Sequence, residues 1–504
     1  MFRDLETLKD LMGISDPDVI QKALTVSSGF VGINLEATAK LMLPLYAGLR
    51  NRVPVDRPKQ GGTQAIWRMQ LGYGGFDFSA NMGTAFAAVG GNATGTAVTI
   101  QADYRSQALK GEVDFEAIPM AQGFDEPLAV ETSRVLATLL KLEELLTLGG
   151  NSVALPVAAG TGTPSAAAGA FGAGNWTVQI GALTLAGCLS NADSTAPSHS
   201  GESLPSAAIV VVVPGGTATY LDVTWAPVRG ALGYKVYCGI AAGNAITYLC
   251  PKANLAYALD TPLTTTAITD DGTTYVGVNR IRITAPSLNT YQTVPIADAT
   301  VQANAYDGLV NWVEKSTMYS VNLAASGTRL LVNGAGQALT NAAAGIVEFD
   351  RILQSMWSTW QISPTLIVAS PQSVAHLTNK LAAVNSGFMY RVDITQERGK
   401  FTGGVFLSAY VNKFAATMLG DQAATIPVWS HPYMPDGTYL FMVERVPYQY
   451  SREARGFALD VLQPYTYFEL ARSARTIPFD IFFTQVLKCY HPLAQAALVG
   501  VRTE

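Results

Sequence analysis

Residues 125–150 read DEPLAVETSRVLATLLKLEELLTLGG, and the rest of the chain is organised around them. Their apolar residues recur at three- and four-residue spacing, which lines one face of a helix with Leu128, Val135, Leu139, Leu142 and Leu146, and places Leu136 and Leu140 beside them. Asp125 and Pro127 suit the first turn, whereas Gly149 and Gly150 are expected to end the helix in a left-handed conformation. The pattern predicts a capped rod roughly 35 Å long, at about 1.5 Å per residue.

The composition limits the classes of function. The chain has 504 residues, which is enough for two to four folding units with real cores. Its net charge is -5 and only 14% of its residues are charged, so it lacks the basic stripe that sequence-reading nucleic-acid binding requires, although passive contact with nucleic acid stays open. No run approaches the roughly eighteen apolar residues of a membrane span, and the first residues do not read as an export signal. We expect a cytosolic, unsecreted protein.

The cysteines and histidines predict no cofactor, metal or catalytic site. The four cysteines include no Cys-x-x-Cys pair, and a hairpin that placed Cys238 opposite Cys250 would still hold reduced thiols. The four histidines match no spacing with a known mechanism, and His376 is expected to be packed or solvent-facing. Glu143 and Glu144 are adjacent in the predicted helix, so they point apart and do not form a catalytic carboxylate pair. The protein is not expected to be an enzyme.

The chain before the long helix predicts little core of its own. Residues 1–50 fit either a helical hairpin or an extended arm that contacts a neighbouring subunit. Residues 52–111 alternate short β-prone runs with glycine clusters, which predicts a long two-stranded excursion. Such a ribbon is marginal alone, so we expect something else to cover it.

After the long helix the composition changes. Residues 151–289 are rich in Ala, Gly, Thr, Val and Ser, and no segment there predicts a helix, so we expect a β-sandwich of short strands. Residues 218–239, ATYLDVTWAPVRGALGYKVYCG, resemble the second and third strands of a fibronectin type III module, in which such a tryptophan lies in the core. The resemblance makes Trp225 and Tyr234 core residues of the insertion. Residues 201–213, GESLPSAAIVVVV, resemble the last strand of such a module, so the insertion is either permuted or holds one complete and one partial module.

The chain returns to an α+β pattern after the insertion. Residues 305–316 and 345–360 predict helices, residues 365–369 an apolar strand, and Ser370-Pro371 the start of a further helix. Long strands follow from about residue 440. One domain is therefore expected to be completed by both halves of the chain, with the insertion between them.

This arrangement resembles the major capsid protein of tailed phages, which has the Hong Kong 97-type fold. The residues that carry the resemblance are EELLTLGGNS at the end of the long helix, PTLIVASPQSVAHL in the central α+β segment, and the late strands with their apolar tail ending in Val-Arg. By that resemblance the chain has an N-terminal arm at 1–52, an extended β-ribbon loop at 53–118, peripheral-domain parts at 119–151 and 441–504, and an axial domain at 293–440. The inserted Ig-like or fibronectin-like domain occupies 152–292.

The resemblance implies a structural protein of the virion, assembled in the host cytoplasm. Copies of the chain would form hexamers and pentamers of an icosahedral shell around double-stranded DNA, with the insertion on the outer face. Portal and scaffolding or cement proteins are the expected partners, contact with packaged DNA is non-specific, and no membrane is involved. No scaffolding segment is expected to be cleaved from this chain.

The resemblance also places the ribbon against neighbouring subunits. Lys59 and Lys110 lie near the base and the return of the ribbon, so we expect no covalent cross-link between subunits. Burial of aromatic side chains would stabilise the shell instead, and the candidate contacts are Trp67, Tyr73, Phe76 and Phe78.

Two other functions are weighed against the capsid. A bacterial encapsulin has the same fold and encloses cargo enzymes rather than a genome, and the long insertion favours a virus. A secreted carbohydrate-active or adhesive protein also carries fibronectin modules, but it would need an export signal and would place the module at an end or in a linker.

Overall fold

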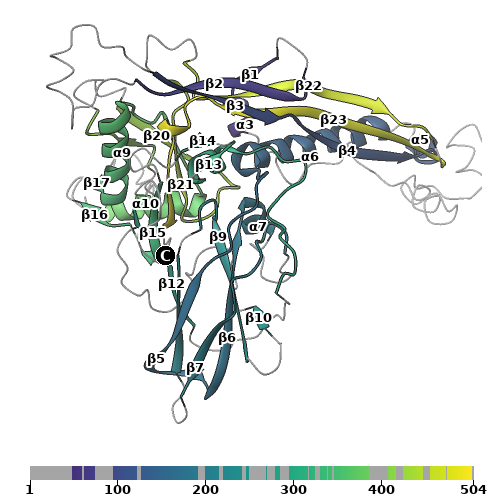
Figure 1. Ribbon diagram of the computed structural model, residues 1–504. Helices are drawn as coiled ribbons and strands as arrows, with labels where there is room; N and C mark the ends of the chain where they lie inside the picture. The colour runs from purple at the N-terminus through teal and green to yellow at the C-terminus, as the bar shows by residue number, and fades with distance from the viewer. Residues whose placement is uncertain are drawn as a thin grey trace, which may run out of the picture.

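A computed structural model of the chain describes residues 48–58, 62–73, 95–121, 126–190, 199–214, 219–226, 228–240, 246–248, 268–269, 279–283, 294–315, 317–319, 321–323, 330–337, 339–342, 345–384, 407–415, 424–446, 454–472 and 474–501. Figure 1 shows three lobes: a sheet domain with its helices on the left, a slender lobe that extends to the right, and a β-sandwich that hangs below. Asp125 and the expected arm before residue 48 lie outside the described residues.

The sheet domain is built on a seven-stranded sheet in the order β11-β15-β24-β21-β18-β20-β19. Its strands are β11 (Ile268–Thr269), β15 (Leu330–Gln337), β24 (Ala496–Val501), β21 (Tyr439–Met442), β18 (Leu366–Ala369), β20 (Thr425–Ser430) and β19 (Ala409–Val411). The helices of this domain are α8 (Leu309–Glu314), α9 (Val347–Trp360), α10 (Pro371–Val384) and the 3-10 turn η1 (Pro492–Ala494). Short two-stranded pairs join β13 (Thr317–Met318) to β14 (Val321–Asn322) and β16 (Asn341–Ala342) to β17 (Gly345–Ile346).

The predicted α+β segment lies in this domain. Phe349 of α9 packs against the rings of Tyr410, Tyr439 and Phe441 at centroid distances of 5.1 to 5.3 Å. The hydroxyl oxygen of Ser370 accepts a hydrogen bond from the Ser373 amide at 3.1 Å, so the predicted cap of α10 is confirmed.

The slender lobe is called the wing below, and it comprises β4 (Arg105–Asp114), α5 (Ala117–Met120), α6 (Pro127–Gly149), β22 (Phe457–Glu469) and β23 (Thr476–Cys489). Its sheet has the order β1-β22-β23-β4, with β1 (Val55–Asp56) parallel to β22 and the other pairs antiparallel. The wing therefore joins the long predicted helix to the late strands. Residues 105–118, which were expected in the extended loop, form β4 and α5 of the wing.

The long helix is present, but its glycine end differs from the prediction. Gly150 caps α6 with φ -57° and ψ 146°, so the left-handed stop was wrong. The two glycines are needed for close packing instead: a Cβ on Gly150 would lie 2.3 Å from the Tyr306 carbonyl oxygen, and one on Gly149 would lie 2.5 Å from Leu185. Glu126 precedes the helix without a side-chain cap, and Pro127 occupies the first turn as expected.

The described part of the ribbon is the hairpin of β2 (Gln64–Tyr73) and β3 (Gly95–Asp103), which pair only with each other. Its inward side chains are buried in the core that the sheet domain shares with the short helix α3 (Gly48–Arg52). The expected cover for the base of the ribbon is therefore supplied by other segments of the same chain.

The insertion contains two sheets, in the orders β10-β9-β6-β7 and β12-β8-β5. The strands are β5 (Gly160–Phe171), β6 (Gly174–Leu183), β7 (Ile209–Val213), β8 (Thr219–Trp225), β9 (Gly233–Ile240), β10 (Ile246–Tyr248) and β12 (Asn279–Ile283). Buried residues of both sheets form one core, so the described strands make one sandwich. The short helix α7 (Leu185–Ser190) also lies here, where no helix was expected.

Candidate assembly surface

The wing is a thin two-layer structure. Val135 and Leu139 of α6 pack on Phe479, Ile481 and Phe483 of β23, and these residues belong to one small buried cluster. A Cβ on Gly111 of β4 would lie 2.2 Å from the Phe479 ring, so the glycine lets that ring lie against the backbone of β4. One helix on one face of a narrow sheet leaves much of the wing surface open.

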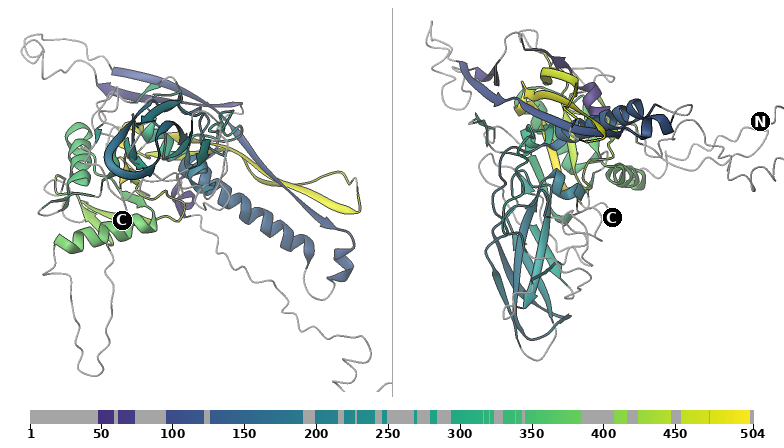
Figure 2. Two further views of the ribbon diagram at one scale, coloured as in Figure 1. Left: turned by 90° about the horizontal axis from the view of Figure 1, so that it is seen from below. Right: turned by 90° about the vertical axis from the view of Figure 1, so that its right-hand side faces the viewer.

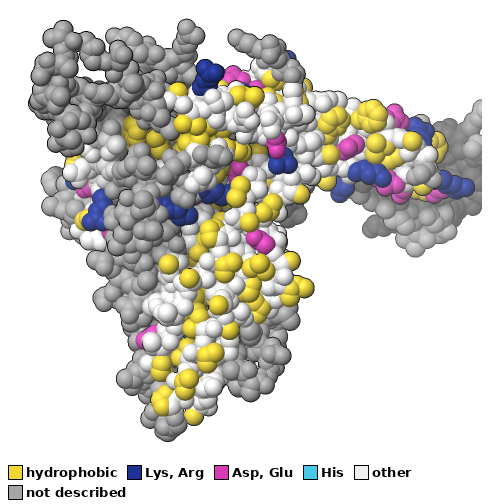
Figure 3. Space-filling view, viewed as in Figure 1, with side chains coloured by type: hydrophobic (Ala, Val, Ile, Leu, Met, Phe, Trp, Pro, Cys, Tyr) yellow, Lys and Arg dark blue, Asp and Glu magenta, His cyan; other side chains and the backbone are white. Residues whose placement is uncertain are grey.

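Large hydrophobic side chains are exposed along the outer part of the wing. Met120 is 78% exposed, Phe468 58% and Phe115 56%. Exposed apolar residues on the same lobe also include Ile118, Val130, Leu136, Leu462 and Tyr467. Figure 3 shows hydrophobic side chains along the wing with charged ones among them. Apolar surface gathered on one lobe is typical of a contact site for another protein.

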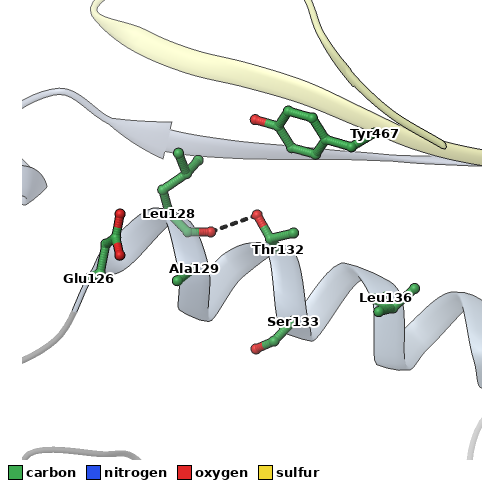
Figure 4. Close-up of a pocket in the computed structure, with 7 residues that line it drawn as sticks. All are labelled: Glu126, Leu128, Ala129, Thr132, Ser133, Leu136 and Tyr467. Carbon is green, nitrogen blue, oxygen red and sulfur yellow. Dashed lines mark hydrogen bonds between the residues drawn. The ribbon is translucent and has the colours of Figure 1, made fainter. Parts of the chain in front are cut away.

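A hollow lies within this surface, between α6 and the end of β22 (Figure 4). It has a volume of about 540 Å³, and its lining comprises Glu126, Leu128, Ala129, Thr132, Ser133, Leu136 and Tyr467. The Tyr467 ring stacks on Phe479 at 5.3 Å and so forms a fixed wall. We call the exposed hydrophobic residues of the wing together with this hollow the wing surface.

Two buried glutamates fix the base of the wing. Glu143 accepts hydrogen bonds from Arg50 Nε at 3.0 Å and from the Tyr465 hydroxyl at 2.5 Å. Burial, and then the Glu143 charge, raise the pKa of Tyr465. Glu143 and Glu144 are both fully buried. Their burial could not be predicted from the sequence, because the residues that contact them are remote in the chain.

The insertion is held at its root by polar contacts. Asn151 Nδ2 donates to the Thr300 carbonyl oxygen at 2.8 Å, which places the entry and the exit of the insertion side by side. Asp307 accepts hydrogen bonds from the Ser152 hydroxyl at 2.5 Å and from the Tyr319 hydroxyl at 2.8 Å. Lys315 Nζ lies 3.4 Å from Asp307, and burial lowers the pKa of this lysine while the aspartate opposes that shift.

The predicted core residues of the insertion lie inside it. Trp225 of β8 is 1% exposed and Tyr234 of β9 is 4% exposed. Their rings meet edge to face between the two sheets, with centroids 5.3 Å apart. Strand β7, the apolar end of residues 201–213, pairs with β6 in the sheet opposite β8. It is therefore not paired with the strand that carries Trp225.

Of the four side chains predicted to contact neighbouring subunits from the ribbon, the structure describes only that of Trp67. Trp67 is 7% exposed, donates Nε1–H to the Cys489 carbonyl oxygen at 3.1 Å and packs on Trp312, so its assignment as a contact to a neighbouring subunit was wrong. Tyr73 ends β2, and its side chain is not among those described. Phe76 and Phe78 lie outside the described residues.

The exposed residues of the wing were not predicted from the sequence. One signal for them was available in β22, where Tyr467 and Phe468 are adjacent. Neighbouring side chains of a strand point to opposite faces, so one of two adjacent aromatic rings must lie on the face away from the helix.

His376 is packed, which is one of the two alternatives that the sequence left open. His376 is buried in α10, and burial lowers the pKa of its imidazole. The described part of the chain holds no group of three or more His, Cys, Asp or Glu side chains placed to bind a metal ion. Among the described helices, none is both long and apolar enough to cross a membrane.

The comparisons with known proteins give similarities of structure only. No protein-family model matches the sequence, and no curated protein matches it either. The chain is similar to the solved capsid of cyanophage A-1(L), with a TM-score of 0.45, 10% identity, and coverage of 95% of this chain and 99% of that chain. It is similar to the capsid of a native GTA particle at a TM-score of 0.43 and 9% identity, over 95% of this chain and 98% of that one.

An encapsulin is among the similar structures as well. The holo-SrpI encapsulin complex from Synechococcus elongatus PCC 7942 aligns at a TM-score of 0.35 with 8% identity, over 92% of this chain and 93% of that chain. All three scores are below 0.5, so the function has to be inferred from the contacts and surfaces of the chain itself.

Proposed function

We propose that this chain is a shell-forming structural protein, the major capsid protein of a tailed phage with the Hong Kong 97-type fold. Copies of it assemble as hexamers and pentamers into an icosahedral shell around double-stranded DNA. The observation that carries the proposal is the wing surface, where Met120, Phe115 and Phe468 are each more than half exposed at the far end of a thin lobe. Portal and scaffolding or cement proteins are its proposed partners.

The shape of the wing supports assembly with copies of the same chain. The wing projects from the sheet domain in Figure 1 and in the left view of Figure 2, so its outer end touches little of the described part of the chain. A contact between the wing surface and a different patch on an identical neighbour is heterologous, and heterologous contacts close into rings when the rotation permits. A shell supplies such a contact to every wing, which removes the exposed apolar area from water.

The proposed position of the insertion follows from its own core and its root. It extends away from both the sheet domain and the wing (Figure 1), and the core between its two sheets holds residues of the insertion alone. At its root, Leu183, Leu185 and Leu232 pack in the core shared with the sheet domain. We therefore place the insertion on the outer face of the shell as a fibronectin-like accessory domain. An inward position would take up the volume needed for packaged DNA.

The test uses two charge substitutions in the wing surface. Purified full-length protein is expected to form large closed particles, alone or with a scaffold, by light scattering and negative-stain microscopy. Met120→Glu and Phe468→Glu should abolish particles and leave a folded subunit, because both side chains are exposed and a charge there opposes burial at a contact. Ile296→Glu is the matched control, since Ile296 is 98% exposed but lies outside the wing.

Two results would count against the proposal. The first is a wild-type protein that stays monomeric under all assembly conditions, and the second is normal particles from both wing variants. Nuclease-protected DNA inside particles from cells would support a phage capsid, whereas enclosed protein cargo would favour a compartment shell.

A further inference from the structure

The insertion contains a closed polar cluster on the outer face of its four-stranded sheet. Lys235 and Tyr237 are two residues apart on β9, so they point to the same face, opposite to Tyr234 in the sandwich core. Glu202 lies over them, and all three of Lys235, Tyr237 and Glu202 are fully buried. Burying a lysine beside a carboxylate is costly, because both charges lose their hydration.

The polar atoms of the cluster lie within hydrogen-bonding distance of the Glu202 carboxylate. Lys235 Nζ lies 3.0 Å from Glu202 Oε2, and the Tyr237 hydroxyl donates to the other carboxylate oxygen, Oε1, at 2.5 Å. His199 Nδ1 lies 3.1 Å from Oε2, and its side chain is 33% exposed. The amine and the imidazole therefore meet at one oxygen, while the phenol holds the other.

The backbone holds Glu202 over the sheet. The amide of Ser203 donates to the Ala182 carbonyl oxygen at 2.8 Å. At the exit of the insertion, the Ala299 amide donates to the Glu202 carbonyl oxygen at 2.9 Å, and the Gly201 amide donates to the Ala299 carbonyl oxygen at 3.2 Å. A Cβ on Gly181 would lie 2.5 Å from Glu202 Oε1, so only glycine at this position leaves room for the carboxylate. The cluster is thus built by three separate segments and is not a chance surface pair.

We propose that Lys235 and Glu202 become joined by an intrachain isopeptide bond. The lone pair of Nζ attacks the Glu202 carboxyl carbon, the new C–N bond forms, and the bond from that carbon to Oε2 breaks. Oε2 leaves as water with two of the three protons of the lysine ammonium group, and the third stays on the amide nitrogen. No oxidant, metal or further reactant is needed, because the pair loses one water molecule in total.

The neighbouring side chains assist in defined ways. Tyr237 donates to Oε1, the oxygen that carries negative charge in the tetrahedral intermediate and becomes the amide carbonyl oxygen. His199 is placed to pass a proton to Oε2 as that oxygen leaves, and its exposed edge opens toward solvent, where the water departs. The product is a neutral amide, which removes the cost of holding two charges without water.

The bond would lock the insertion near its root. It would close a loop between residues 33 positions apart and tie β9 to the segment whose backbone contacts Ala299 at the exit of the insertion. A link within one chain produces no ladder of subunits on a denaturing gel, so it is compatible with a shell that is held together by non-covalent contacts.

Intact-mass spectrometry of the denatured full-length protein tests the proposal. The wild type is expected to weigh one water less than its sequence, and proteolysis should release a branched peptide that contains both Lys235 and Glu202. Lys235→Arg keeps the positive charge but lacks the nucleophile, so it should show the full sequence mass. His199→Gln and Tyr237→Phe should each slow the appearance of the branched peptide in freshly made protein.

Two outcomes would overturn the assignment. One is a wild-type protein of full sequence mass whose Lys235 and Glu202 peptides remain linear after prolonged incubation. The other is a loss of water that persists in Lys235→Arg, since cyclisation at Asp271-Gly272 would give the same mass change. The branched peptide of the wild type decides the matter even if a variant folds poorly.

Discussion

Glu144 Oε1 lies 2.7 Å from His431 Nε2, and both side chains are fully buried although 287 residues separate them. The same carboxylate accepts the backbone amide of Leu49 at 2.9 Å and that of Arg50 at 2.7 Å. One side chain of α6 therefore joins the first described helix, the wing and the sheet domain.

Removal of the Glu144 carboxylate should loosen all three segments. Glu144→Ala leaves the buried His431 ring and the two α3 amides without their partner, so we expect the free energy of unfolding to fall by about 3 kcal/mol or more. Chemical denaturation measures this loss, and hydrogen exchange should show faster opening of residues 48–52.

Glu131→Ala is the control for that experiment. Glu131 pairs with Arg134 one turn along α6, and the arginine side chain is 73% exposed, so the loss should stay below about 1 kcal/mol. Equal losses in the two variants would contradict the role assigned to Glu144.

Glu314 should make stability depend on pH. Burial raises the pKa of this carboxyl well above its ordinary value of 4.5, and Lys315 opposes the shift only in part. An acid whose pKa is raised by folding stabilises the protein below its unfolded pKa, and that contribution is lost as the pH rises toward the folded pKa. The free energy of unfolding attributable to this group should therefore decline as the pH rises above about 4.5.

Glu314→Gln tests this dependence. The neutral amide should flatten the decline and make the protein more stable than the wild type at pH 7, because no charge then has to be buried. Unfolding curves at several pH values provide the measurement. Glu112→Gln is the exposed control and should leave the pH profile unchanged, so parallel profiles for wild type and Glu314→Gln would refute the prediction.

Gly150→Ala should be strongly destabilising at the junction of α6 with the sheet domain. The added Cβ would lie 2.3 Å from a backbone oxygen of Tyr306, which cannot rotate away, so we expect a loss of about 2 kcal/mol or more in thermal or chemical unfolding. Gly172→Ala is matched to it because nothing lies within 4 Å of its added Cβ, and it should be neutral or slightly stabilising. Similar losses for both would show that backbone freedom, not close packing, explains the glycine at 150.

Replacement of residues 152–292 by a short flexible linker should leave the wing and the sheet domain folded, although it removes β11, the two-residue edge strand beside β15. The Asn151 to Thr300 hydrogen bond of 2.8 Å shows that a short linker can span the gap. Circular dichroism and microscopy should find a folded chain that forms shells without external knobs. If the shortened chain folds but forms no shell, the insertion is part of the lattice contacts.

Local patterns in the sequence determined the parts of this structure that depend on near neighbours. The three- and four-residue spacing of Val135, Leu139 and Leu146 predicts α6 because side chains at that spacing share one helix face. Ser370 capped α10 because its hydroxyl needs only an amide three residues away. The resemblance to a fibronectin type III module likewise predicted that Trp225 and Tyr234 lie in the core of the insertion, where both are buried.

Only the tertiary structure decided which distant segments meet. The local sequence around Glu144 identifies no partner for its carboxylate. The fold brings His431 and the α3 amides to it, and His431 is 287 residues away. Gly150 reads as a left-handed stop until the Tyr306 carbonyl oxygen is found against it. Trp67 reads as a surface contact until the ribbon folds back on Trp312. In each case the partner is selected by packing between segments remote in the chain, and local spacing carries no information about that packing.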